Sequence, residues 1–180
     1  MRMFKTFAIA ALAASATTGA FAADIITVPT STPVEMPVAE PAGFDWNGFY
    51  AGVYGGLQGS PVGGQQYGLG VDAGVNTTFD FYLLGAEVAV HGLTGGVGNT
   101  SYGQILGRAG LIVTDDVVAY GAAGYGIDLG VPAESDFLLG GGVELAVTDA
   151  VSVRAQYLHG FPITGGNQKD QFTVGANYHF

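Results

Sequence analysis

The last ten residues, QFTVGANYHF, alternate strictly between apolar and other side chains. One face carries Phe172, Val174, Ala176, Tyr178 and Phe180, and the other carries Gln171, Thr173, Gly175, Asn177 and His179. A period of two is typical of a β-strand with one apolar face. The surroundings of that apolar face are therefore the main constraint on the fold.

The same alternation recurs through the chain. It is clear in residues 66–76, 81–91, 138–147 and 151–158, and weaker in WNGFYAGVYGG, GQILGRAGLIV and VVAYGAAGYGI, where glycine interrupts both faces. With the last segment this makes eight strands of about ten residues, the length that a tilted strand needs to cross a bilayer. The turns in VTDDV and VTDAV are tight. The connections around 60–64, 92–100, 130–134 and 161–169 are longer and rich in glycine. Short turns at one end and longer loops at the other are typical of outer-membrane barrels.

The composition decides which face meets lipid. Charged residues make up only 11% of the chain, against roughly 25% in soluble domains. The chain has 31 glycines, which lie mostly on the non-apolar faces among sparse Asp, Glu, Arg, Gln and Asn residues. Glycine covers a water-exposed surface poorly but suits the crowded interior of an eight-stranded barrel. We therefore expect an all-β fold, an eight-stranded antiparallel transmembrane up-and-down barrel with its apolar face toward lipid.

Closure of the barrel and aromatic belts follow from this fold. The final strand is expected to pair with the first, which leaves no open sheet edge. Aromatic residues near strand ends are predicted to form the girdles at the two membrane interfaces. They are Trp46, Phe49, Tyr50, Tyr82, Tyr120, Tyr157, Tyr178 and Phe180.

The N-terminal part is predicted to be separate from the barrel. Residues 1–22 have the features of a secretory signal peptide: Arg2 and Lys5, an apolar FAIAALAA core, and small residues Ala20 and Ala22 before the cleavage site. Residues 23–43 carry four prolines at a spacing of four and are predicted to be an extended periplasmic linker. Whether that linker contacts peptidoglycan is open. The barrel is expected to occupy residues 44–180.

Charge and composition exclude several functions. The formal net charge is −10, and cleavage would remove two basic residues to leave −12. The basic residues that remain, Arg108, Arg154 and Lys169, cannot neutralise a phosphate backbone, so no nucleic acid partner is expected. The chain has no cysteine, and its histidines lack metal-site spacing. No metal and no cofactor are predicted.

Four charged residues occupy positions that alternate with the apolar residues and are therefore expected to face the lumen: Glu87, Arg108, Glu144 and Arg154. An unpaired charge in a narrow lumen would cost several kcal/mol, so carboxylate–guanidinium pairs are predicted. Such pairs would either fill the lumen or act as a gate that opens by exchanging partners. Filling is favoured because an eight-stranded barrel is normally packed inside. Asp72, Gln104, Gln156 and Asn177 are predicted to extend this network.

An enzyme is not predicted. A barrel hydrolase that acts on lipid would need a Ser–His pair on the lipid-facing wall. Ser152 and His159 are expected on opposite faces of the same strand, so they cannot form such a pair. We expect His91 and His159 to lie near the outer ends of strands, where exposed polar residues are common.

Several blocks resemble the strands of a known family. DWNGFYAGVYGG, GRAGLIVTDDVVAYGAAGYG, GGGVELAVTDAVSVRAQYLHG and VGANYHF are similar to the small outer-membrane β-barrel family of Gram-negative bacteria, which includes alphaproteobacterial surface antigens and opacity-type proteins. The likeness covers about residues 45–180. Two features depart from it: Gln156 stands where the family often has Glu, and the predicted outer loops are short.

The resemblance implies a location in the cell outer membrane, surrounded by lipid and lipopolysaccharide, with both termini periplasmic. Tyr178 and Phe180 would be the signal read by the barrel-assembly machinery. The expected function is a structural role in the envelope with presentation of a small surface. The alternative is a narrow porin-like channel for small solutes or ions, and a third hypothesis is an enzyme that modifies lipid A.

Overall fold

The structure, a computed structural model, describes residues 43–61, 64–96, 98–130, 134–165 and 168–180. The predicted signal peptide with Ala20 and Ala22, and nearly all of the predicted linker, lie outside the described residues. Among the described residues, no helix has the length and hydrophobicity to cross a membrane.

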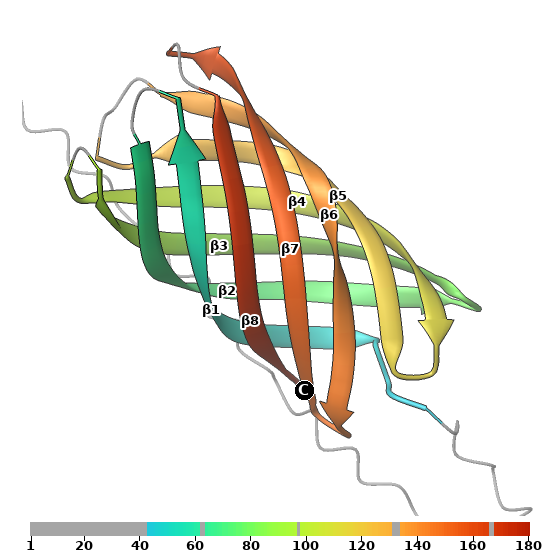
Figure 1. Ribbon diagram of the computed structural model, residues 1–180. Helices are drawn as coiled ribbons and strands as arrows, with labels where there is room; N and C mark the ends of the chain where they lie inside the picture. Colours follow the sequence, from blue (N-terminus) through green and yellow to red (C-terminus); the bar gives the residue numbers. More distant parts are fainter. Residues whose placement is uncertain (1–42, 62–63, 97, 131–133, 166–167) are drawn as a thin grey trace, which may run out of the picture. The chain divides into compact units, whose positions relative to one another are not determined.

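Eight antiparallel strands form a closed barrel (Figure 1). Each strand pairs with the next, and β8 pairs with β1, so that Tyr50 lies opposite His179 and Gly59 opposite Asp170. The strands are β1 (Gly48–Ser60), β2 (Gly64–Phe79), β3 (Tyr82–Gly95), β4 (Thr100–Thr114), β5 (Val117–Asp128), β6 (Ser135–Thr148), β7 (Val151–Thr164) and β8 (Lys169–His179). The predicted fold class and the predicted closure are confirmed.

The two ends of the barrel differ. Two-residue turns join β2 to β3, β4 to β5 and β6 to β7 at the end where β1 begins and β8 finishes; we call this the terminal end. The opposite end, the loop end, has connections of three to six residues. Two loops are shorter than predicted, because residues 92–95 and 161–164 continue β3 and β7. Their backbones still pair with neighbouring strands, as in Thr94 opposite Tyr67 and Phe161 opposite Phe137.

The barrel is apolar outside and polar inside. Large hydrophobic side chains stand exposed along every strand, and the side chain of Leu69 is 78% exposed. Charged and amide side chains are buried in the lumen, as Asp72, Glu87 and Arg108 are. In water such an outer surface would drive aggregation, whereas in a bilayer it is the surface that lipid requires. The predicted sidedness of the wall is therefore observed.

Three of the aromatic residues predicted for the girdles are not on the wall. Trp46, Tyr50 and Tyr120 face the lumen and are at most 5% exposed. Glycine interrupts both faces of these segments, so the sequence pattern did not fix which side each ring takes. The hydroxyl groups of Tyr50 and Tyr120 also have polar partners inside. The other predicted girdle residues are exposed on the wall: Phe49, Tyr82, Tyr157, Tyr178 and Phe180.

Inward tyrosines pack over glycines of the neighbouring strand. Three of them stand directly opposite a glycine: Tyr50 opposite Gly74, Tyr54 opposite Gly70 and Tyr120 opposite Gly142. A Cβ atom at Gly142 would lie 2.7 Å from the Tyr120 hydroxyl oxygen and 2.5 Å from the backbone oxygen of Ala155. Glycine is therefore needed where the ring crosses the strand.

We expect Gly142→Ala to destabilise the barrel by about 1–3 kcal/mol, the usual cost of inserting a methyl group into packed space. Gly107→Ala is the matched control, because a Cβ there points outward and its nearest neighbour, the backbone oxygen of Ala123, lies 3.7 Å away. Urea unfolding in detergent micelles measures both variants. Equal stability of the two variants would contradict the packing argument.

Candidate functional site

Five charged residues cross the middle of the lumen, and we call them the ionic layer. They come from five strands: Asp72 from β2, Glu87 from β3, Arg108 from β4, Glu144 from β6 and Arg154 from β7. Each of these side chains is at most 2% exposed. The structure brings together all four charged residues predicted for the lumen, and Asp72, predicted as a polar neighbour, is a full member of the layer.

Glu87 lies at the centre of the ionic layer. Its Oε2 atom accepts a hydrogen bond from Arg154 Nη1 and one from the Tyr50 hydroxyl at 2.6 Å. Arg108 Nη1 is 3.4 Å from the same oxygen. β3 and β7 lie on opposite sides of an eight-stranded closed barrel, so the Glu87–Arg154 pair spans the lumen.

The two guanidinium groups complete the layer. Arg108 Nη2 is 2.6 Å from Glu144 Oε2, and Arg154 Nη2 is 2.7 Å from Asp72 Oδ2. The guanidinium carbon of Arg108 also lies 4.0 Å from the centroid of the Tyr120 ring, a cation–π distance. Arg154 and Glu144 are neighbours across β6 and β7, yet each pairs with a residue from another strand.

A second group of polar residues supports Glu144 from the side of the terminal end. Glu144 Oε1 accepts hydrogen bonds from Ser152 Oγ at 2.6 Å and from Asn177 Nδ2 at 2.8 Å. His179 Nε2 lies 2.9 Å from Ser152 Oγ and 3.5 Å from the same carboxylate oxygen. This Ser–His–Glu group was not predicted from the sequence, because the three residues meet only through the register of β6, β7 and β8.

This group does not have the geometry of a catalytic triad. In a triad, serine donates its hydrogen to histidine, and the other ring nitrogen of that histidine donates to the acid. Here the Ser152 hydroxyl donates to Glu144, and the same nitrogen of His179 faces both partners. Among the described residues, none is a hydrogen-bond partner of His179 Nδ1. The arrangement therefore orients the Glu144 carboxylate and leaves the serine without a general base.

The remaining residues predicted for the lumen are also buried, but they differ in their contacts. Gln156 Oε1 accepts a hydrogen bond from the Tyr120 hydroxyl at 3.0 Å. Gln104 is buried, and its Oε1 atom has no hydrogen-bond partner within the described ranges. Tyr178 and Phe180 are exposed on the wall, with ring centroids 5.2 Å apart.

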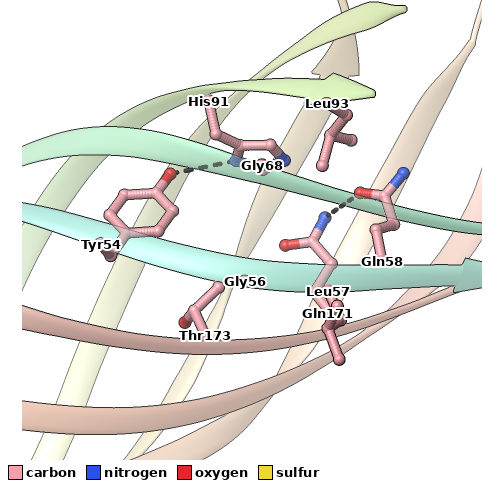
Figure 2. Close-up of a pocket in the computed structure, with 9 residues that line it drawn as sticks. All are labelled: Tyr54, Gly56, Leu57, Gln58, Gly68, His91, Leu93, Gln171 and Thr173. Atoms are coloured by element: carbon pink, nitrogen blue, oxygen red, sulfur yellow. Dashed lines mark hydrogen bonds between the residues drawn. The ribbon is translucent and has the colours of Figure 1, made fainter. Parts of the chain in front are cut away.

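Between the ionic layer and the loop end lies a small lumen cavity (Figure 2). Its lining includes His91, which was predicted to be exposed but is only 5% exposed. The His91 side chain points inward, because its position alternates with the outward-facing residues of β3. The Tyr54 hydroxyl lies 3.0 Å from His91 Nδ1. Gln171 Nε2 donates to Gln58 Oε1 at 3.1 Å, while the Gln171 Oε1 atom has no hydrogen-bond partner among the residues described. A buried amide oxygen of this kind is a position where an ordered water molecule binds.

At the loop end, Lys169 closes the polar interior. Its Nζ atom is 2.9 Å from Asp136 Oδ2 and 3.5 Å from Glu134 Oε2. The Tyr102 hydroxyl donates to the same Asp136 oxygen at 2.7 Å, and Lys169 Nζ lies 5.0 Å from the centroid of the Tyr102 ring. Polar contacts thus cross the lumen at its middle and again near the loop end.

One polar group lies on the outer wall. Asp170 Oδ1 is 2.6 Å from the Tyr157 hydroxyl and 2.7 Å from His159 Nδ1, all on outward positions of β7 and β8. His159 is therefore near an outer strand end, as predicted. Among the described residues, no group of three or more His, Asp or Glu side chains is arranged to hold a metal ion.

Comparison with known proteins identifies the fold. No protein-family model matches the sequence, and no curated protein is significantly similar to it. The structure of Ail, the attachment invasion locus protein of Yersinia pestis, is 12% identical with a TM-score of 0.54, over 73% of this chain and 96% of that chain. Neisserial surface protein A is 15% identical with a TM-score of 0.52, over 73% of this chain and 97% of that chain. At these identities the likeness establishes the fold, a small eight-stranded barrel of the outer-membrane type.

We expect Arg108→Met to destabilise the barrel by about 3–5 kcal/mol, because it leaves buried carboxylates without their partner. Adding Glu144→Gln should recover part of this loss, since the second change removes one of the unpaired charges. Asp170→Asn is the control: its partners are on the outer wall, and no measurable change is expected. Urea unfolding in micelles measures all three variants, and an unchanged midpoint for Arg108→Met would contradict the role of the ionic layer.

Proposed function

We propose that this protein is an integral outer-membrane β-barrel with a structural role in the cell envelope, which presents a small surface at its loop end and whose lumen is closed. The observation that carries the proposal is the ionic layer, whose five side chains are buried and paired across the lumen. The apolar outer wall and the likeness to outer-membrane barrels support the location.

The contacts of the ionic layer make opening of the lumen energetically costly. Displacing Arg108 would break its contacts with Glu144 and Tyr50 together, and would leave Glu87 with one guanidinium partner instead of two. Breaking one buried charge pair by losing a partner costs about 3–5 kcal/mol. A barrel held in this way serves best as a rigid body in the membrane.

The neighbouring proteins suggest a ligand that this chain does not favour. Ail has been solved in complex with the heparin analogue sucrose octasulfate. In this chain, Lys169 is the one basic residue described at the loop end, and it is buried against Asp136 and Glu134. We therefore propose contacts of the apolar outer wall with the acyl chains of outer-membrane lipid and lipopolysaccharide rather than with a sulfated polysaccharide at the loop end. Assembly by the barrel-assembly machinery through Tyr178 and Phe180 belongs to the same proposal.

A narrow channel for small solutes or ions is the second candidate. It is favoured by buried polar atoms of the ionic layer that have no hydrogen-bond partner among the residues that the structure describes: Asp72 Oδ1, Glu87 Oε1, Arg108 Nε and Arg154 Nε. Atoms of this kind are commonly served by water in other proteins. An enzyme is not proposed, because Ser152 faces the lumen and His159 has Tyr157 and Asp170, not a serine, around it.

Planar-bilayer recording separates the first two functions. The purified wild-type protein is expected to leave the membrane electrically silent, and Arg154→Ser should stay silent too, because the Lys169–Asp136 contact remains in the lumen when the residue bound to both Glu87 and Asp72 is removed. Heat-modifiable mobility on a gel verifies that each sample is folded. Steady conductance steps from the wild-type protein would favour the channel.

Fractionation tests the location. The protein should be recovered from the outer-membrane fraction only with detergent, because its outer wall is apolar on every strand. A soluble periplasmic protein of similar size is the control. Recovery in the soluble periplasmic fraction would contradict the proposal whatever the bilayer recordings give.

A further inference from the structure

The residues that precede β1 do not belong to the barrel wall. Residues 43–47 come before the first strand, yet Trp46 is 2% exposed and Phe44 is half-buried. The backbone N–H of Phe44 and the indole N–H of Trp46 both donate to the backbone oxygen of Asp115, each at 3.3 Å. Asp115 lies in the turn between β4 and β5, across the closed barrel from β1. The segment therefore crosses the mouth at the terminal end.

Aromatic contacts fill this mouth. The rings of Phe44 and Trp46 are 4.5 Å apart, and both contact the His179 ring, at 4.8 and 5.7 Å. Trp46 belongs to one apolar cluster with Leu83 and Val118, which are fully buried, and Phe44 packs against that cluster. We call Phe44 and Trp46 the aromatic plug.

The attachment of the plug differs from that of a strand. Its two hydrogen bonds to the far side go to a single carbonyl oxygen, and both are slightly longer than the usual 2.7–3.2 Å. Neither of its side chains carries a charge. Where the segment joins β1, Gly48 has φ +105, a backbone conformation that residues with a side chain rarely adopt. Next to it, Asn47 Oδ1 accepts a hydrogen bond from the Thr78 backbone N–H at 2.7 Å. The plug is thus hydrogen-bonded to β2 next to its base, whereas on the far side it is held by apolar packing and two long hydrogen bonds.

Polar groups lie behind the plug. Ser152, His179 and Asn177 are buried next to Glu144, and two of their atoms, His179 Nδ1 and Asn177 Oδ1, have no hydrogen-bond partner in the described part of the chain. Buried unsatisfied atoms are costly, and contact with water would satisfy them. Removing the plug would therefore expose a surface that is ready to be hydrated.

We propose that the aromatic plug is a separable lid, hinged at Gly48, that closes the terminal mouth and shields the Ser152–His179–Glu144 group from the aqueous compartment. The proposal does not depend on whether ions pass through the lumen, because it concerns only the access of water from the terminal end of the barrel. A lid of this kind makes exposure of the polar group at this mouth dependent on the residues that precede the barrel.

The first test uses Trp46, the single tryptophan of the chain. In the folded wild-type protein, its emission should be blue-shifted, and acrylamide should quench it several-fold less than in the urea-unfolded protein. Equal quenching in the two states would overturn the proposal, because the indole would then lie in water instead of in the mouth.

The second test measures access to the group behind the plug. The chain has no cysteine, so Ser152→Cys provides a single thiol at a fully buried position. Labelling by a water-soluble maleimide should be slow in this variant and at least tenfold faster when Phe44→Ala and Trp46→Ala are added. Phe49→Ala is the matched control, since Phe49 is 68% exposed on the outer wall next to the same segment, and it should leave the rate unchanged.

Each outcome of the second test is decisive when mobility on a gel is recorded alongside. A folded, fast-labelling plug variant supports a separable lid. A folded variant that labels as slowly as its parent shows that the plug does not shield Ser152. Loss of the folded band in both the double variant and Phe44→Ala alone would show that these rings are part of the barrel core, which also overturns the proposal.

Discussion

Each strand in a bilayer must find hydrogen-bond partners for its backbone without help from water. In this chain the requirement is met by closure, because β8 pairs with β1 along Tyr50 to Gly59 and no strand edge is left open. Closure with eight strands leaves an interior only wide enough for side chains. The other features of the structure, from the glycines to the ionic layer, follow from this narrow lumen and from the lipid outside it.

The narrow lumen explains the residues that fill it. Tyrosine rings fit where the opposite strand offers glycine, and their hydroxyl groups reach the charged centre, as that of Tyr50 does with Glu87. The ionic layer joins opposite walls through Glu87 and Arg154, so a slip of one strand by a single residue would turn a charge toward lipid. A buried charge pair is weak evidence for high stability, but losing one partner is costly. We therefore regard the layer mainly as a device that fixes register.

The sequence predicted the inward position of every charged residue of the ionic layer, including Arg108 in a glycine-interrupted segment, but it did not predict the burial of Tyr50, Tyr120 and His91. Glu87 and Arg154 lie in strands of strict period two, so their inward parity followed from the pattern. Tyr50 and Tyr120 lie in glycine-rich strands, where both faces look alike. The meeting of Ser152 with His179, and of Trp46 with Asp115, depends on strand register and on a chain reversal, neither of which a local pattern contains. Alternation along a strand shows which face of the sheet a residue lies on, whereas its contact partners depend on how the strands pair in the closed sheet.

Hydration of the lumen and conduction through it are separate matters. The atoms of the ionic layer that lack a partner among the described residues belong to side chains whose other polar atoms are paired. In Asp72, for example, Oδ2 binds Arg154 and Oδ1 has no such partner. A single buried water can satisfy such an atom without any continuous path. A conducting path would have to pass the Lys169–Asp136 contact, the ionic layer and the aromatic plug in turn. The three barriers differ in chemistry, because one is a lysine–carboxylate contact, one a set of guanidinium–carboxylate pairs and one a pair of aromatic rings. Opening one of them therefore does not by itself open the other two.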